Sequence, residues 1–182
     1  MGRPKQLIQH EGRSLLSRAA EAAVEAGADP VVVVLGAYAD EVRPLVARID
    51  GVTVAVNVDW EAGLASSLTT GLRAVREADR DGVLVTLADQ PLVDAQILRR
   101  LVAAFQAGAR IVASGYGGTA GVPALFGREH VPALLGLTGD AGAGSWLRSR
   151  LPEVSVIPLD SALLDIDTPA DLARLAGRQH SR

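Results

Sequence analysis

Acidic residues that directly follow apolar runs are the first candidates for chemistry in this chain. Asp89 comes after the run VLVTLA, so a strand that is otherwise apolar ends by presenting a carboxylate. Pro91 stops that strand, because proline has no backbone N–H to donate. Asp94 stands where the next helix should begin and can cap it. Since the helix has its own cap, a functional role for Asp89 is favoured over a structural one.

A second acidic segment, LLDIDTP, lies near the C-terminus. Asp165 and Asp167 are separated by one residue and face the same side if the segment is extended. The start of a helix explains Thr168 and Pro169, but it does not explain the two carboxylates. Carboxylates from separate strand ends, with no histidine or cysteine nearby, suit Mg²⁺, whose coordination is often completed by substrate phosphates. The sequence therefore predicts Mg²⁺ and a phosphorylated substrate.

The N-terminal segment Gly2-Arg3-Pro4-Lys5 could supply the complementary positive charge. Lys5 is the single lysine among 18 basic residues, although chance explains this equally well. Backbone amides and fixed cations are the groups that hold phosphate oxygens. The segment is not a Walker loop, which reads GxxxxGK followed by Ser or Thr, and no GxGxxG motif opens a helix. Alone, it is a weak indication of phosphate binding.

Two further stretches bring polar or glycine-rich segments next to apolar runs. NVDWEAGLASSL, at residues 57–68, offers Asn, Gly and Ser groups that could bind a base and ribose, although Ser66 or Ser67 could equally cap a helix. We interpret GVPALF, at residues 121–126, and GDAGA, at residues 139–143, as loops. Their composition leaves open whether these loops close on a ligand or only connect elements.

Composition excludes several classes of function. The 182 residues are enough for one domain, residues 1–182, with a core of ordinary size. No apolar run approaches the ~20 residues of a membrane span, and the N-terminus does not read as a signal peptide, so we expect a cytoplasmic protein without membrane contact. The absence of cysteine and the wide spacing of the three histidines argue against zinc. A net charge of −3 with scattered arginines predicts a small-molecule partner and no nucleic acid.

The chain alternates β-branched strand patterns with helical patterns rich in Ala, Leu and Arg. This order predicts a doubly wound α/β fold with a mainly parallel sheet and helices on both faces, in which ligands bind at the carboxyl ends of the strands. We expect residues 177–182 to form a frayed tail. The predicted strands are residues 30–36, 52–56, 82–87, 111–114 and 154–159, and the predicted helices are residues 15–24, 40–48, 66–78, 94–107, 131–135, a helix ending near 150, and 169–176.

Six motifs in a fixed order resemble the MobA-like nucleotidyltransferase family, and within it most closely the molybdenum cofactor cytidylyltransferases. They are MGRPKQL, NVDWEAGLASSL, LADQPLV, GVPALF, GDAGA and LDIDTPADL, and together they span nearly the whole chain. The resemblance implies a Rossmann-like, three-layer nucleotidyltransferase fold. It also implies Mg²⁺-dependent transfer from CTP, in preference to GTP, to the terminal phosphate of a molybdopterin-type cofactor, with release of pyrophosphate. Such in-line transfer needs charge neutralisation and alignment more than a strong base.

The resemblance implies roles for individual residues as well. Lys5 and Arg3 would neutralise the triphosphate, and Asp89 would hold Mg²⁺. Asp167 matches the second metal ligand better than Asp165 does. A xanthine dehydrogenase-type molybdoenzyme would be a further partner. The residues implied on the substrate side are Asn57, Gly63, Ser67 and Asp89 for the nucleotide, and Pro123 and Asp140 for the pterin.

The chain departs from the family pattern at its N-terminus. Family members carry a strand and a loop of the kind LAAGxSxR before the MGRPK-like segment, and this sequence has neither. We therefore expect a chain that is N-terminally truncated relative to the family, and an active protein that is extended at this end.

Other functions stay open beside the transferase. An NAD(P)H-dependent oxidoreductase of the nicotine blue oxidoreductase type would need a nicotinamide or flavin site, yet the dinucleotide fingerprint is absent. A noncatalytic chaperone would bind the molybdenum cofactor without Mg²⁺ or CTP. A sugar-phosphate nucleotidyltransferase is closer in class, but the chain leaves little length for the acceptor-binding elements often attached to it.

Overall fold

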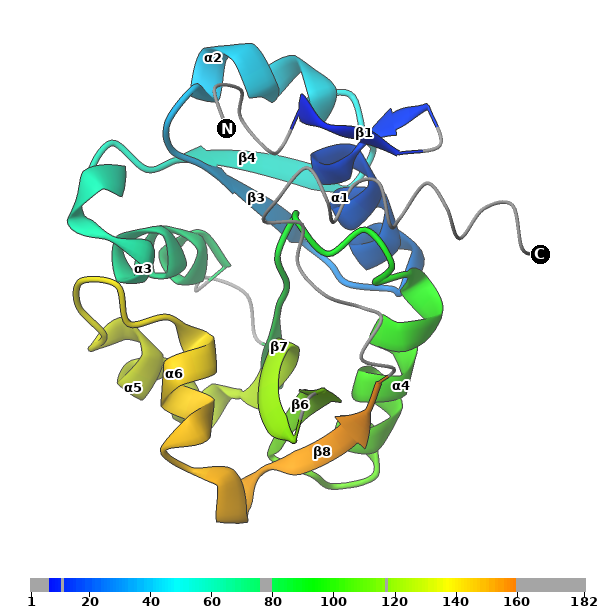
Figure 1. The fold of residues 1–182 in the computed structure, drawn as a ribbon, viewed down its shortest axis with the longest axis vertical. Coiled ribbons are helices and arrows are strands. Elements are labelled where there is room, and N and C mark those ends of the chain that lie inside the picture. The colour runs from blue at the N-terminus through cyan, green and yellow to red at the C-terminus, as the bar shows by residue number, and fades with distance from the viewer. Residues whose placement is uncertain (1–6, 11, 76–79, 117, 160–182) are drawn as a thin grey trace.

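A computed structural model describes residues 7–10, 12–75, 80–116 and 118–159, and the strands of this part form three sheets (Figure 1). One is a short antiparallel hairpin, one is a parallel pair, and the third has four strands in the order β5-β7-β6-β8. The described strands of the second and third sheets do not pair with each other. The strands are β1 (Gln9–His10), β2 (Arg13–Ser14), β3 (Val31–Leu35), β4 (Val52–Val56), β5 (Gly82–Val85), β6 (Ile111–Tyr116), β7 (Thr119–Gly127) and β8 (Ser155–Pro158).

Helices and short 3-10 turns connect these strands. None of the helices in the described ranges is long and apolar enough to cross a membrane. The α-helices are α1 (Leu15–Glu25), α2 (Ala39–Val42), α3 (Leu64–Val75), α4 (Ala95–Gln106), α5 (Val131–Leu135) and α6 (Ala143–Arg148). The 3-10 turns are η2 (Arg43–Leu45), η3 (Trp60–Ala62), η4 (Arg128–His130) and η5 (Leu151–Glu153).

The four-stranded sheet lies between two layers of helices, with α3, α5 and α6 on one side and α1 and α4 on the other (Figure 1). Alternate residues of β6 face opposite layers, so Ile111 packs in the core with α5 and α6 whereas Val112 packs with α4. Phe126 of β7 is fully buried and meets Trp146 of α6 edge-on, with ring centroids 5.7 Å apart. The predicted three-layer α/β fold is therefore confirmed.

β7 is the main departure from the predicted elements. The sequence predicts a loop at residues 121–126, but this segment is buried and belongs to β7, a strand that pairs antiparallel with both β5 and β6. The short connection from Tyr116 to Thr119 joins antiparallel neighbours, because a parallel pair needs a much longer crossover. Gly121 and Pro123 hid the strand, since both residue types usually mark breaks in strands. The sheets are mixed, with parallel pairs at β3–β4 and β6–β8.

Local sequence signals account for two helix boundaries. Asp94 caps α4 as predicted, because its Oδ1 accepts a hydrogen bond from the backbone N–H of Ile97 at 2.9 Å. The helix predicted at residues 40–48 is shorter in the structure. α2 ends at Val42, and Pro44 lies in the 3-10 turn η2, since proline cannot continue an α-helix.

Candidate functional site

The loop that follows β5 carries Asp89. The ladder between β5 and β7 ends with the pair Val85 and Ala124, and the half-buried Asp89 follows in the loop beyond it. The next residue, Gln90, is only 4% exposed, and its Nε2 donates to the carbonyl oxygen of Val122 at 3.0 Å. The structure thus places Asp89 beyond the carboxyl end of β5, as the sequence predicts.

An irregularity in β7 lies beside this loop. Ala113 of β6 pairs with Ala124, but Ser114 pairs with Gly121, so Val122 and Pro123 are left out of the ladder. Side chains satisfy the carbonyls of these two residues. Val122 O accepts from Tyr116 Oη at 2.7 Å and from Gln90, and Pro123 O accepts from Ser114 Oγ at 2.8 Å. Pro123 is itself buried, and its predicted contact with the pterin stays a prediction.

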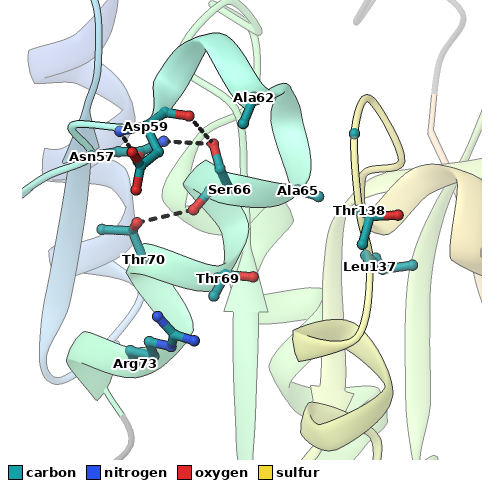
Figure 2. Close-up of a pocket in the computed structure, with 11 residues that line it drawn as sticks. Asn57, Asp59, Ala62, Ala65, Ser66, Thr69, Thr70, Arg73, Leu137 and Thr138 are labelled. Atoms are coloured by element: carbon teal, nitrogen blue, oxygen red, sulfur yellow. Dashed lines mark hydrogen bonds between the residues drawn. The ribbon is translucent and has the colours of Figure 1, made fainter.

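Asn57 organises the loop between β4 and α3. Its side chain is 4% exposed, and its Oδ1 accepts from the backbone N–H of Asp59 at 3.0 Å. Its Nδ2 donates to Ser66 Oγ at 2.8 Å (Figure 2) and to Ser67 Oγ at 3.0 Å. Both N–H groups of the amide are therefore used within the chain. Asn57 fixes the loop against the start of α3, and its predicted contact with the nucleoside stays a prediction.

Gly63 and Asp140 meet although they are far apart in the sequence. Gly63 has φ +101°, and a Cβ placed on it would lie 2.8 Å from Asp140 Oδ1 and in collision with the carbonyl of Gly139. The backbone N–H of Ala65 donates to Gly139 O at 3.0 Å. Only glycine combines this backbone conformation with so close an approach. The NVDWEAGLASSL and GDAGA motifs therefore form one structural unit.

A cavity of about 280 Å³ opens between α3 and the segment 137–139 (Figure 2). Asn57 and Asp59 lie at one end of its α3 wall, and Arg73 lies at the other. Thr70 Oγ1 donates to Ser66 O at 2.9 Å, so the hydroxyl is directed along the helix. The lining residues are Asn57, Asp59, Ala62, Ala65, Ser66, Thr69, Thr70, Arg73, Leu137, Thr138 and Gly139.

The contacts divide the predicted site residues into two groups. The α3 group, around the start of α3, consists of Asn57, Gly63, Ser67 and Asp140. The β7 group consists of Asp89 and Pro123, which are connected through Gln90 and Val122. Arg3, Lys5, Asp165 and Asp167 lie outside the described residues. Within the described ranges, no three or more His, Cys, Asp or Glu side chains converge as a metal site.

Several residues that the structure places beside the two groups were not predicted from the sequence. Thr69, Thr70 and Arg73 line the cavity, and their spacing of three to four residues on a helix was the available signal. Gln90 was overlooked because a polar residue after a strand is expected to be exposed. Its burial between Asp89 and Pro91 depends on tertiary pairing with β7, which no local pattern reveals.

One carboxylate with a perturbed pKa lies away from both groups. A backbone hydrogen bond and then the guanidinium of Arg110, whose Nε lies 2.8 Å from Oε1, hold the pKa of Glu129 below its usual value. Gly127, two residues before Glu129, pairs with Gly82 at the start of β5, whereas Asp89 follows the end of β5. The Glu129–Arg110 pair is therefore a surface ion pair remote from the candidate site.

A family model described as a MobA-like NTP transferase domain matches residues 1–154. The chain belongs to this family. The match covers every described element except the last strand, and it includes both the α3 group and the β7 group. The predicted membership of the MobA-like family is thus confirmed, and residues 1–154 form a MobA-like NTP transferase domain.

Individual relatives of this MobA-like domain differ in the activities that their names state. Nicotine blue oxidoreductase of Paenarthrobacter nicotinovorans is 33% identical over 94% of this chain and 87% of that protein. The crystal structure of Rv0371c from Mycobacterium tuberculosis H37Rv matches with a TM-score of 0.81 and 31% identity, over 97% of this chain and 91% of that one. A nucleotidyl transferase from Methanothermobacter, Mth528, matches with a TM-score of 0.80 and 25% identity, over 98% and 86% of the two chains.

Proposed function

We propose that this protein transfers a cytidylyl group from CTP to the terminal phosphate of a molybdopterin-type cofactor in the cytoplasm, releasing pyrophosphate. The observation that carries the proposal is Asp89, a carboxylate presented beyond the end of β5 in a MobA-like NTP transferase domain. A xanthine dehydrogenase-type molybdoenzyme is the partner expected to receive the product.

A divalent cation fits the donor set of this chain. Magnesium is commonly held by one or two carboxylates together with substrate phosphates, so it needs no cluster of three protein ligands. Asp89 would supply one carboxylate and Asp167 the second. A manganese complex is known for Rv0371c, with 30% identity to this chain and a TM-score of 0.72, which supports a divalent ion in this family. Bound there, the cation would neutralise charge on the triphosphate.

Transfer by this domain would depend mainly on alignment. A phosphate oxygen of the acceptor attacks the α-phosphorus of the nucleotide, a new P–O bond forms, and the bond to the β-phosphate oxygen breaks as pyrophosphate leaves. Lys5 and Arg3 would neutralise the negative charge of the departing pyrophosphate. Gly63 and Asp140, predicted on the nucleoside and pterin sides, are adjacent, so two substrates bound to them would also be adjacent. This proximity supports a reaction between two bound substrates.

The preference for CTP over GTP rests on the similarity of the motifs LADQP and GVPALF to the cytidylyltransferases. It is tested by supplying CTP and GTP together at equal concentration with molybdenum cofactor and identifying the dinucleotide by mass spectrometry. We expect the cytosine dinucleotide in excess. An excess of the guanine dinucleotide would reverse this part of the proposal and leave nucleotidyl transfer intact.

A reductase is the second candidate, because nicotine blue oxidoreductase is 33% identical over 94% of this chain. Hydride transfer requires a nicotinamide or flavin site, and the GxGxxG fingerprint that opens a dinucleotide-binding helix is absent from the sequence. The same enzyme preparation can be assayed for NAD(P)H oxidation with a heteroaromatic dye as acceptor, in the absence of any nucleoside triphosphate.

The deciding experiment measures pyrophosphate release with Mg²⁺, CTP and molybdenum cofactor, alongside NAD(P)H oxidation. The proposal predicts release that requires all three components and no NAD(P)H consumption. NAD(P)H consumption without pyrophosphate would establish the reductase instead. Cofactor binding that needs neither Mg²⁺ nor CTP, with no turnover in either assay, would indicate the chaperone.

A further inference from the structure

The loop that carries Asp89 is attached to β7 at both of its ends. At the first end, Val85 is paired with Ala124 in the β5–β7 ladder. At the second end, the side chain of Gln90 donates to the carbonyl of Val122 at 3.0 Å. The two anchoring positions on β7 are two residues apart, a span of about 7 Å along a strand. Residues 86–89 therefore form a short loop with both ends fixed to the same strand.

The carbonyl that receives Gln90 is itself held in place. Because Val122 and Pro123 are left out of the β6–β7 ladder, their carbonyls depend on side chains for hydrogen bonds. Tyr116 Oη donates to Val122 O at 2.7 Å, and Ser114 Oγ donates to Pro123 O at 2.8 Å. A Cβ on Gly121 would lie 2.5 Å from Tyr116 Oη, so glycine is needed for Tyr116 to reach Val122. Gln90 thus binds to a fixed point in the sheet.

The backbone on the other side of Gln90 is also restrained. The N–H of Val93 donates to the carbonyl of Gln90 at 3.0 Å, and Asp94 then caps α4. The side chain of Gln90 is directed into the β7 irregularity, and its main chain is joined to the first turn before α4. Asp89 immediately precedes Gln90, whose side chain and main chain are both hydrogen-bonded. These two hydrogen bonds limit rotation of the backbone at Asp89.

Burying the side chain of Gln90 costs free energy of folding that an apolar side chain would not cost. Its presence here therefore points to a role that an apolar side chain could not fill. A buried amide costs free energy when its polar atoms are not hydrogen-bonded, and an apolar residue of similar shape can be as stable. Val122 O already has a second donor in Tyr116, so satisfying this carbonyl does not require Gln90. The hydrogen bond from Gln90 Nε2 also connects the sheet to the position immediately after Asp89.

We propose that Gln90 is a positioning residue that holds the Asp89 carboxylate where a divalent cation is bound, through its hydrogen bond to Val122. The inference rests on the proposed function, in which Asp89 is a metal ligand. Removing a group that orients a metal ligand typically lowers metal affinity by about 10-fold or more. Gln90 acts on Asp89 through the backbone, since its Nε2 hydrogen bond goes to Val122. Gln90 touches neither the cation nor a substrate in this proposal.

The test compares Mn²⁺ binding by the variants Gln90→Leu, Tyr116→Phe and Asp89→Asn. Binding is measured without nucleotide, by electron paramagnetic resonance of the free ion. Gln90→Leu removes the anchor, and Tyr116→Phe is the matched control, because it removes the other hydrogen bond to the same carbonyl and leaves the loop attached. We expect both variants to lower the melting temperature by a similar amount, about 2–4 °C. Gln90→Leu should weaken Mn²⁺ binding about 10-fold, whereas Tyr116→Phe should not change it.

Asp89→Asn separates failure of this inference from failure of the proposed function. If Asp89→Asn weakens Mn²⁺ binding and Gln90→Leu does not, Asp89 is a ligand and Gln90 is only a satisfied core residue. Equal weakening by Gln90→Leu and Tyr116→Phe would also overturn the inference, since a general loosening of β7 would then explain both. If Asp89→Asn leaves Mn²⁺ affinity unchanged, the metal assignment itself is wrong and Gln90 has no ligand to position.

Discussion

The two groups of predicted site residues are held in place by different kinds of contact. In the α3 group, polar side chains bind one another, as Asn57 binds Ser66 and Ser67, beside an open cavity. Around the β7 group, side chains bind backbone carbonyls inside the buried sheet, as Gln90 binds Val122. We infer that the two groups have different roles. In the proposal made above the sheet positions the Asp89 carboxylate through Gln90, whereas the loop before α3 borders a cavity.

The largest expected effect on stability comes from the core beneath the β7 group. Phe126 is fully buried and packs edge-on against Trp146. Phe126→Ala should lower the free energy of unfolding by about 3–5 kcal/mol, because it removes a large apolar side chain and leaves a cavity. Urea denaturation measures this loss, and Phe126→Leu, which retains more of the volume, should cost clearly less. A loss from Phe126→Ala below about 1 kcal/mol would contradict the packing of β7 against α6 described above.

Gly63→Ala should have the next largest effect and should act on the α3 group. Gly63 has φ +101° and ψ 179°, a backbone region that is essentially restricted to glycine and costs a residue with a Cβ about 1–3 kcal/mol, and the collision with Gly139 adds to that cost. Gly108→Ala is the matched control, because Gly108 has φ +110° and nothing within 4 Å of the added Cβ.

The two glycine variants are compared by thermal unfolding and by the rate of pyrophosphate release. Gly108→Ala should lose stability alone, whereas Gly63→Ala should also lose activity, since it separates the start of α3 from the Asp140 loop. Equal activity in the two variants would show that the contact between these motifs has no part in the reaction.

Asn57→Ala is expected to lower the free energy of unfolding by less than Phe126→Ala or Gly63→Ala. It removes the amide from three hydrogen bonds, to Asp59, Ser66 and Ser67, and should cost about 1–3 kcal/mol. Ser67→Ala removes only one of these bonds and should cost about 0.5–1.5 kcal/mol. Hydrogen exchange should show faster exchange in the loop between β4 and α3 and no change in β7. Faster exchange in both regions would contradict the separation of the two groups.

Much of the fold could be predicted from the sequence, because its signals are local. Asp89 lies at the end of a predicted strand, and Asp94 caps the following helix as expected. The segment 121–126 was misassigned as a loop, because its glycine and proline suggest a turn and only the flanking strands β5 and β6 make it a strand. The contact between Gly63 and Asp140 was equally hidden, since it depends on the tertiary packing of two loops far apart in the sequence.

The most direct test of the central claim is Asp89→Asn, which removes a negative charge and nearly preserves the shape of the side chain. The measurement is pyrophosphate release with Mg²⁺, CTP and molybdenum cofactor, together with the free energy of unfolding of the same variant. The account predicts a loss of transfer of at least about 100-fold and a stability change within about 1 kcal/mol. A variant that keeps full activity, or that fails to fold, would contradict the assignment of Asp89 as the catalytic metal ligand.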